Sequence, residues 1–342
     1  MNSPLINKLL AGLILAMFFA PFFTSAANLM DASRPEFAQS RFPLVAVAVA
    51  EIPDSQSLTV EKLAEQLSAI ANDDEEKAFA IFRWITTHIR YDVEKLRAGS
   101  GRNLTAPEVM ELRQAVCGGY AALYQALASA MKLQSFTVTG QAKGYGTGTM
   151  GHAWTAVKTG PRWVLIDATW GSGYLDEQQQ FVRQYNDYYF MVPPAELIYS
   201  HFPDEPNWQL LEKPVSRVDF KQSAHLYSSF FELGLGLQAI AFSPDGSRLT
   251  LQFSNPRQAK FSARILSDGR EVKGNWYLPG SNGENSTLEI KFPAAGDYGL
   301  EVFGQSAKKN KTYHTRHSAP LKACFLFMEI GRNNTIKMML NY

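Results

Sequence analysis

The spacing of apolar positions changes along this 342-residue chain, and each change marks a change of predicted structure. After a stretch broken by three prolines, apolar residues recur every three or four positions, which is typical of amphipathic helices. The predicted helices cover residues 58–70, 75–89, 109–115 and 117–131. Beyond residue 132 apolar and polar positions alternate, which predicts strands at residues 135–141, 153–158, 163–169 and 188–192.

From about Val218 onward only the strand pattern remains. Clear runs cover residues 249–253, 261–266, 288–292 and 298–303, and Asp-Gly or Asn-Gly pairs between them are strong turn signals. The tripeptide Gly296-Asp297-Tyr298 resembles the tyrosine corner of immunoglobulin-like sandwiches. These features predict a separate β-sandwich of roughly 90 residues.

The predicted fold class is therefore α+β, with helices packed on an antiparallel sheet and a C-terminal immunoglobulin-like β-sandwich. The expected parts are a signal peptide (1–26), an irregular N-terminal segment (27–57), a core of helices and strands (58–215), the β-sandwich (216–305) and a last segment (306–342). For that last segment, a final edge strand and a poorly ordered tail both remain open.

The N-terminus has the features of an export signal. Lys8 precedes an apolar run over residues 9–23, and Thr24-Ser25-Ala26 offers small residues for cleavage. The run is short for a membrane span, and no later stretch is apolar enough to be one. We expect an exported protein, periplasmic or extracellular, with an uncleaved anchor as the alternative.

Composition narrows the class of partner. Hydrophobic residues make up 46% of the chain and charged residues 19%, so the chain can bury sizeable cores. Lys8 alone supplies the formal net charge of +1, so the chain without its first 26 residues is formally neutral. That balance argues against nucleic acid or an acidic membrane surface as a partner held by bulk charge.

Cys117 is the leading candidate for chemistry. It opens the predicted helix 117–131, where the helix dipole favours a thiolate and unpaired N–H groups can bind an oxyanion. Gly118 and Gly119 follow it, which keeps side chains away from a substrate at a cost of roughly 1 kcal/mol each in helix stability. The alternatives are a buried thiol that only packs, or a disulfide with Cys324, the second cysteine of the chain.

A base and a carboxylate can be placed by counting residues. The runs 153–158 and 163–169 predict two antiparallel strands joined by a short turn, with Lys158 opposite Trp163. In that register His152 and Asp167 form a diagonal pair on one face of the sheet, within reach of a hydrogen bond. With Cys117, they form a nucleophile, a base and a group that orients the base.

Several motifs then occur in a recognisable order. They are Trp84-Ile85 with Tyr91-Asp92, the run from Val116 to Ala121, His152-Ala153-Trp154, and the run from Asp167 to Gly171. Over residues 60–175 they resemble the transglutaminase-like superfamily. Asp187 to Phe190, His201-Phe202-Pro203 and Trp208 to Leu211 resemble its kyphoscoliosis-peptidase branch, in which a β-rich region follows the core. The resemblance implies a papain-like core with Cys117 as nucleophile, His152 as general base and Asp167 as orienter.

The expected reaction is formation of an acyl-enzyme on Cys117 from a peptide or protein amide. Water as acceptor makes a peptidase or amidase, and a lysine amine makes a transglutaminase-type cross-linker; the motifs do not select between them. The rival hypothesis is a non-catalytic extracytoplasmic binding or scaffold protein that docks a partner through the β-sandwich.

Neighbouring residues suggest where a substrate would bind. We expect substrate contacts at Gly118, Trp154 and Trp170, although core packing explains the two tryptophans equally well. His201 is either a second functional histidine or, as we favour, part of a packed turn before Pro203. Cysteine and histidine spacings typical of metal sites are missing from the sequence, so no metal or other cofactor is expected.

Overall fold

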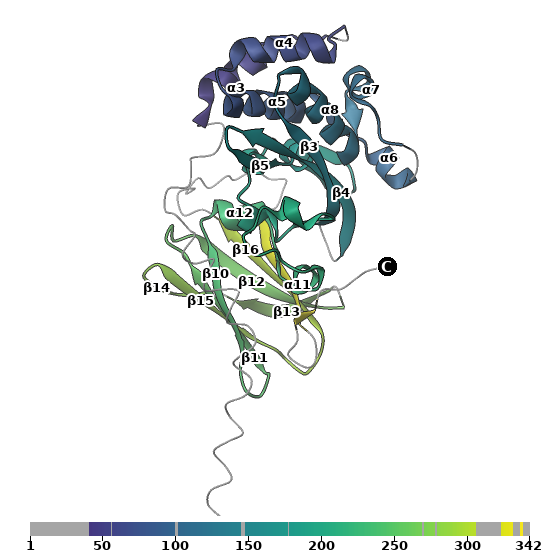
Figure 1. The fold of residues 1–342 in the computed structure, drawn as a ribbon. Helices are drawn as coiled ribbons and strands as arrows, with labels where there is room; N and C mark the ends of the chain where they lie inside the picture. Colours follow the sequence, from purple (N-terminus) through teal and green to yellow (C-terminus); the bar gives the residue numbers. More distant parts are fainter. Residues whose placement is uncertain are drawn as a thin grey trace, which may run out of the picture. The chain divides into compact units, whose positions relative to one another are not determined.

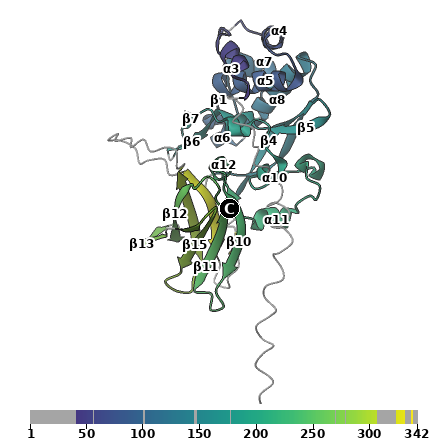
Figure 2. The ribbon, with the colours of Figure 1, turned by 90° about the vertical axis from the view of Figure 1, so that its left-hand side faces the viewer.

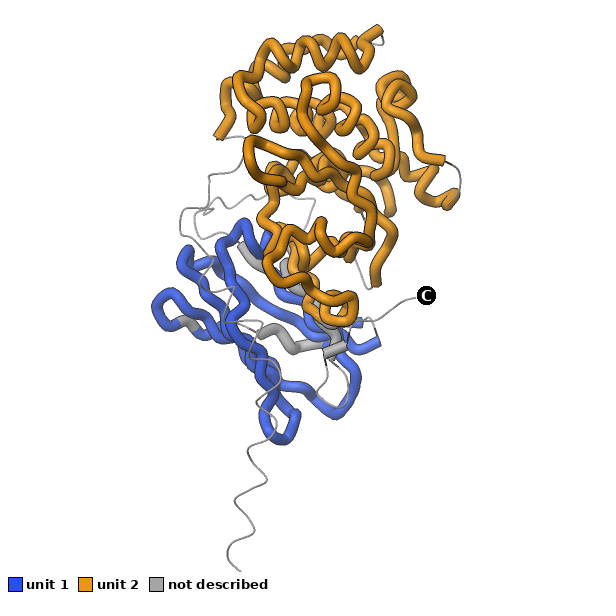
Figure 3. The backbone as a smooth tube through the Cα atoms, viewed as in Figure 1, with its two compact units in different colours: residues 1–34, 229–335 blue, residues 35–228, 336–342 orange. Residues whose placement is uncertain are grey.

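The structure is a computed structural model that describes residues 41–55, 57–99, 102–144, 148–176, 178–268, 270–277, 279–305, 323–330 and 336–337. The predicted signal peptide lies outside these residues. The chain separates into two compact units, which Figure 3 colours separately. We call residues 35–228 the helix-and-sheet unit and residues 229–335 the β unit, and each is described by itself.

Helices make up the first part of the helix-and-sheet unit. They are α3 (Pro43–Ala50), α4 (Val60–Ile70), α5 (Asp74–His88), α6 (Val93–Ala98), α7 (Ala106–Leu112) and α8 (Cys117–Ala130). Side chains cap the starts of α4, α5 and α6, where Thr59, Asp73 and Asp92 each accept a hydrogen bond from an N–H of the first turn. In Figures 1 and 2, α4, α5 and α8 gather into one helical layer.

An antiparallel sheet lies against α8. Its strands are β3 (Ser135–Lys143), β4 (Thr149–Thr159), β5 (Arg162–Ile166) and β8 (His201–Pro203). They are hydrogen-bonded in the order β5-β4-β3-β8, so β3 separates the strand that carries His152 from the strand that carries His201. Lys158 pairs with Trp163, which confirms the predicted register of the β4–β5 hairpin.

Short elements complete this unit. They are β1 (Arg90–Tyr91), β2 (Gln114–Ala115), α9 (Ala168–Ser172), β6 (Gly173–Leu175), β7 (Phe181–Arg183), η1 (Asp187–Tyr189), α10 (Pro194–Leu197), η2 (Pro206–Gln209), α11 (Arg217–Gln222) and β9 (His225–Leu226). The parallel pair β1–β2 ends one residue before Val116, the N-cap of α8. Phe220 of α11 is fully buried, and its ring centroid lies 5.2 Å from that of Phe202 in β8.

Helix α8 is the central helix of the core and is held by two tyrosines. The Tyr120 hydroxyl donates to the Ile89 carbonyl and the Tyr124 hydroxyl to the Ala78 carbonyl, each at 2.7 Å. Both rings are at most 1% exposed, so each buries a large apolar area while its polar end is satisfied. The helix that begins at Cys117 is therefore fixed against α5 and the segment that follows it.

The β unit contains two antiparallel sheets, preceded by the short helix α12 (Ser228–Glu232). Its strands are β10 (Gly236–Phe242), β11 (Arg248–Ser254), β12 (Lys260–Ser267), β13 (Arg270–Tyr277), β14 (Gly280–Asn282), β15 (Asn285–Lys291), β16 (Tyr298–Gln305) and β17 (Ala323–Ile330); β18 (Ile336–Lys337) lies beyond it in the sequence. One sheet has the order β10-β11-β15-β14, and the other contains β13-β12-β16-β17.

Alternating burial gives the β unit its core. Phe253 of one sheet and Phe261 of the other have ring centroids 5.1 Å apart, so the two sheets share apolar contacts. The Tyr298 hydroxyl donates to the Ala294 carbonyl at 3.0 Å, which is the bond expected of a tyrosine corner. An immunoglobulin-like relationship of this region stays a prediction.

The α+β fold class is confirmed, and the differences from expectation are local. Residues 43–50, expected to be irregular, form α3. The strand expected over residues 163–169 ends at Ile166, because the Asp167 side chain caps α9 and turns the chain into a helix. Residues 187–189 form a 3₁₀ helix where a strand was expected from residue 188. Residues 216–228, expected to belong to the β-sandwich, fall in the helix-and-sheet unit.

Among the described residues, the helices are too short or too polar to cross a bilayer.

Candidate active site

Cys117 is the first residue of α8, and no side chain among the described residues caps the start of this helix. The N-cap is Val116, whose side chain makes no capping hydrogen bond. The N–H groups of Gly119 and Tyr120 bond to the Val116 carbonyl, which leaves those of Cys117 and Gly118 without an intrahelical acceptor. Two N–H groups and the positive end of the helix dipole therefore surround the thiol, a setting that favours bound negative charge.

The two glycines after Cys117 serve close packing. A Cβ on Gly118 would lie 2.3 Å from Nδ2 of Asn103, and a Cβ on Gly119 would lie 2.6 Å from Cβ of Ala115. The space beside Gly118 is thus taken by the Asn103 side chain, where we expected open room for substrate. Asn103 is therefore a neighbour of the site, and nothing in the sequence predicted it.

His152 and Asp167 meet as predicted. His152 lies on β4, Asp167 follows β5 directly, and His152 Nε2 is 2.7 Å from Asp167 Oδ2. The other carboxylate oxygen, Oδ1, accepts the N–H groups of Thr169 and Trp170 at 2.8 and 3.0 Å, the caps of α9. The carboxylate is therefore held from two sides, by a side chain and by a helix start.

The charges of the three groups support one another. Burial raises the pKa of Cys117, but a hydrogen bond with His152, the charge of His152 and the Ala153 N–H outweigh it, so this pKa lies below its ordinary value. Burial lowers the pKa of His152, but Asp167 and Cys117 raise it to about 10. Burial likewise opposes the charge of Asp167, yet the two histidines hold its pKa well below the usual range. The arrangement favours a thiolate–imidazolium pair beside an ionised carboxylate.

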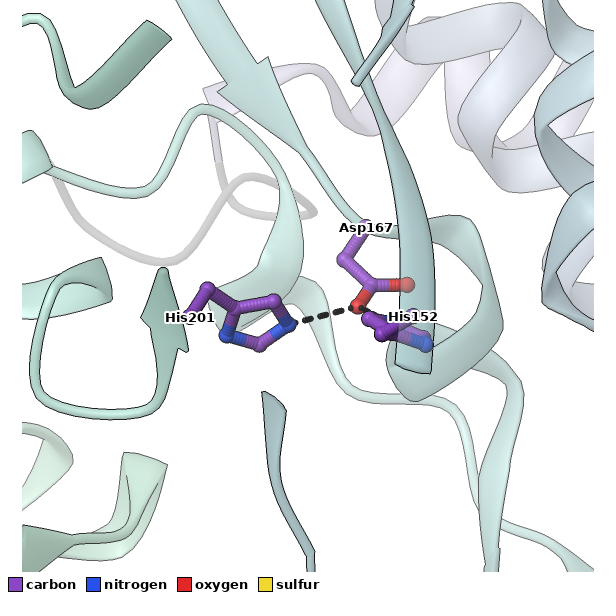
Figure 4. A group of neighbouring side chains, drawn as sticks. All are labelled: His152, Asp167 and His201. Carbon is purple, nitrogen blue, oxygen red and sulfur yellow. Dashed lines mark hydrogen bonds and ion pairs between the residues drawn. The ribbon is translucent and has the colours of Figure 1, made fainter. Parts of the chain in front are cut away.

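His201 joins this group, as Figure 4 shows. Its Nε2 lies 3.0 Å from the same Asp167 Oδ2 that His152 contacts, and the two histidine ring centroids are 5.2 Å apart. From the sequence, a packed turn before Pro203 is the favoured interpretation of His201, since nothing in the sequence next to it indicates a contact made through β3–β8 pairing. The structure places it against the carboxylate.

His152, Asp167 and His201 have nitrogen and oxygen atoms within 4.8 Å of one another, a spacing that a cation could also use. Each of these atoms already takes part in a hydrogen bond, however, and both histidine nitrogens share one carboxylate oxygen. Hydrogen bonding accounts for the cluster, and we assign it no metal.

The two tryptophans differ in exposure. Trp154 is 2% exposed, so it packs behind the histidines and offers a substrate no surface; of the two roles left open for it, the structure favours core packing over substrate contact. Trp170 is only partly buried, and its ring lies 5.6 Å from that of His152. Of the two, Trp170 can still contact a substrate beside the base.

Cys117 is a free, partly exposed thiol in the structure, and the side chain of Cys324, its alternative disulfide partner, lies outside the described residues. The triad expected from the sequence thus consists of a thiol on a helix start, an imidazole on a strand and a carboxylate at a helix cap. Together they can generate a nucleophile, transfer a proton and keep the imidazole oriented.

Comparison with known proteins places the chain in a family. Residues 61–168 match the model of the transglutaminase-like superfamily. Kyphoscoliosis peptidase of Mus musculus is 32% identical over 263 residues, which cover 72% of this chain and 38% of that protein. Hillarin of Drosophila melanogaster is 29% identical, covering 77% of this chain and 36% of its own length. A solved structure described as a TGase is 20% identical with a TM-score of 0.27, covering 39% of this chain and 37% of its own, and has no bearing on function.

The chain belongs to the transglutaminase-like superfamily. Within it, the chain falls in the branch that contains kyphoscoliosis peptidase. It spans 38% of the length of those relatives.

Proposed function

We propose that this protein is a thiol enzyme that forms an acyl-enzyme on Cys117 from peptide or protein amides. One observation carries the proposal: a partly exposed thiol stands at a helix start without a side-chain cap, and its pKa is lowered by His152, which a buried carboxylate holds at 2.7 Å. A structural helix start has no need of this combination, and acyl transfer uses each part of it.

In the proposed first step, the Cys117 thiolate attacks the carbonyl carbon of the amide and a C–S bond forms. The carbonyl oxygen becomes an oxyanion, which the N–H groups of Cys117 and Gly118 can bind. The His152 imidazolium gives its proton to the nitrogen of the scissile bond, the C–N bond breaks, and an amine leaves. His152, now neutral, can take a proton from the acceptor in the second step.

The acceptor decides the biochemical class. Water releases a carboxylic acid and makes the protein a peptidase or amidase, whereas a lysine amine forms a new amide and makes it a transglutaminase-type acyl transferase. The name of the relatives, kyphoscoliosis peptidase, favours water as acceptor and a peptide as substrate. Incubation of the protein with a peptide substrate and an added amine would identify the acceptor. A product that contains the added amine indicates acyl transfer, and a product with a free carboxylic acid indicates hydrolysis.

We further propose that the protein is exported and that the β unit recruits a protein substrate or partner. The proposal of export rests on the apolar run over residues 9–23 and the small residues after it. N-terminal sequencing of the protein recovered from a secreting host, with cleavage expected after about residue 26, tests it. A chain that keeps residues 1–26 and fractionates with membranes would contradict it.

The catalytic proposal is tested by thiol reactivity and turnover together. With iodoacetamide, Cys117 should be alkylated at a pH where a free model thiol is still mostly protonated, because its pKa is lowered. Cys117→Ser should release no amine from a peptide mixture that the unmodified protein cleaves. If Cys117 reacts no faster than the model thiol and no amine is released, the rival hypothesis of a binding or scaffold protein holds.

A further inference from the structure

Asp167 accepts more hydrogen bonds than the orienting group of a three-residue site requires. Oδ1 takes two backbone N–H groups, and Oδ2 takes Nε2 of both His152 and His201. We propose that His201 is a positioning residue: it fixes Oδ2 of Asp167 so that the carboxylate keeps His152 aligned with the thiol. The inference rests on the proposed function and adds a fourth residue to it.

Strand pairing delivers His201 to this place. Gly140 of β3 lies opposite His152 on β4 and opposite Pro203 on β8, while Ala142 lies opposite His201. Directly paired residues share a face of a sheet, and positions 140 and 142 share one too, so both histidines stand on the same face. The smallest side chains of β3 therefore stand where the two imidazole rings need room.

Gly140 also sets how closely β8 can approach. A Cβ at this position would lie 2.1 Å from the Phe202 carbonyl oxygen, a distance that no side chain tolerates. Any larger residue would push β8 away from β3 and withdraw His201 from Asp167. A glycine inside a strand weakens it, so its presence is explained by this close approach.

Two tryptophans hold the ring of His201 in place. Its centroid lies 5.2 Å from Trp154 and 4.5 Å from Trp170, both edge-to-face, and the residue is 1% exposed. A ring confined in this way keeps one orientation without further ordering when the reaction begins. Trp154 is too buried to contact a substrate, and its packing against His201 explains why it lies there.

The contacts of His201 favour one tautomer. Ser200 Oγ lies 2.8 Å from Nδ1 and 3.3 Å from the Leu197 carbonyl oxygen, and its one hydroxyl proton can go to either acceptor. The shorter contact favours donation to Nδ1, which leaves the proton of a neutral ring on Nε2, facing Asp167. Burial lowers the pKa of His201 and the nearby His152 lowers it further, against the pull of Asp167. A neutral donor steadies the carboxylate while the positive charge stays on His152, next to Cys117.

The test compares two replacements of His201 by their effect on His152. His201→Phe keeps a flat ring but removes the donor, and His201→Gln keeps an N–H near the position of Nε2. His225→Phe is the matched control, because His225 is a buried histidine of the same unit whose ring nitrogens have no hydrogen-bond partner among the described residues. The measurement is the titration of His152, followed by NMR of ¹⁵N-labelled histidine in the full chain.

In the unaltered protein His152 should titrate near its pKa of about 10. We expect this value to fall to about 9 or lower in His201→Phe, because an unfilled Oδ2 lets the carboxylate turn away from the imidazolium. His201→Gln and His225→Phe should stay within about 0.3 of the unaltered protein. Near-UV circular dichroism confirms that each variant is folded.

Two results would overturn the proposal: an unchanged titration of His152 in His201→Phe, or an equal fall in the Phe and Gln variants, which would assign the effect to ring packing. If His201→Phe does not fold, Ser200→Ala replaces it. That variant should lower the pKa of His152 by a smaller amount, and an unchanged value contradicts the proposal. The readout needs no substrate, and Cys117, which also raises the pKa of His152, is the same in every variant. A failure of acyl-enzyme chemistry would be seen separately, as unreactive Cys117.

Discussion

The thiol side and the base side of the site are built in different ways. Cys117 is partly exposed, and what activates it locally, a helix start with two free N–H groups, comes from residues 116–120. His152, Asp167 and His201 are nearly inaccessible and come from two strands and a helix cap, up to 49 positions apart in the sequence. The helix start that carries the thiol is made by one short segment, whereas the base that lowers the pKa of this thiol is held in place by several strands.

The largest effect should follow from removing the base. His152→Ala should lower turnover by at least about 10³-fold, since both proton transfers lose their carrier. The pKa of Cys117 should rise towards that of a free thiol, because the hydrogen bond and charge of His152 lower it now. Rates of amine release and of alkylation across pH measure both effects.

Met150→Ala is the control for that experiment. Met150 lies on the same strand, two positions from His152, and is 49% exposed, so this change should leave turnover and alkylation within about twofold. If His152→Ala still alkylates at Cys117 as fast as the unaltered protein near pH 7, the two sides of the site are not coupled and the comparison fails.

A smaller effect is expected from Asp167→Asn, which should lower turnover by about 10²- to 10⁴-fold and leave some activity. Asparagine still caps α9 through its side-chain oxygen, so the helix start survives. The charge that holds His152 is lost, so the pKa of His152 should fall from about 10. Amine release and histidine titration measure these changes.

The same variant has a signature in the pH dependence of unfolding. The pKa of Asp167 is lowered in the folded state, so its stabilisation is present above the unfolded value of about 4 and is lost as pH falls through the folded value. The raised pKa of His152 stabilises fully below about 6.5 and is lost as pH rises towards 10. Urea unfolding should therefore show the largest loss of unfolding free energy in Asp167→Asn between about pH 4 and pH 6.5, where both stabilisations are fully present. A deficit that is constant with pH would mean that the carboxylate charge is not paired.

The smallest effect on the thiol should come from removing the β unit. A fragment of residues 35–228 should alkylate at Cys117 within about twofold of the full chain, since both sides of the site belong to the helix-and-sheet unit. Its activity should fall more on a protein substrate than on a short peptide, because only the protein needs a second contact surface.

The boundary of this fragment can itself be checked. A shorter fragment that ends at Arg217 removes Phe220, which is fully buried, and Ser223, whose oxygens accept hydrogen bonds from the buried Lys143 ammonium at 2.9 Å. We expect it to aggregate where the longer fragment stays soluble, as judged by gel filtration. Equal behaviour of the two fragments would place the boundary near residue 216, as the sequence alone suggested.

What the sequence predicts well is short-range. The helix that begins at Cys117 and the register of Lys158 against Trp163 both follow from residues within about 15 positions, and both are found in the structure. The meeting of His152 and Asp167 follows from that register. The position of Asp167 differs from the prediction in one respect: it contacts His152 from the N-cap of α9 and not from within the predicted strand.

What the sequence missed depends on packing between distant segments. The sequence leaves His201 open as a second functional histidine, but its contact with Asp167 arises because β8 pairs with β3, and the small residues Gly140 and Ala142 of β3 are a weak local sign of that pairing. Asn103 fills the space beside Gly118 from a loop, a contact that no periodicity announces. Trp154 has the aromatic character of a groove wall but lies in the core, since burial depends on what covers a strand.

Asp167 has two roles, one structural and one in the candidate site, and this affects which residues such a protein can lose during evolution. It caps α9 while it holds the base, and replacing a cap by alanine costs about 0.5–2 kcal/mol of folding stability whatever happens to catalysis. Cys117 caps nothing, so a lineage released from selection for activity can lose its thiol with little structural penalty. A relative that has lost the proposed activity is then expected to keep Asp167 and to lack Cys117. The presence of Cys117 therefore supports the proposed activity of this chain more strongly than the presence of Asp167 does.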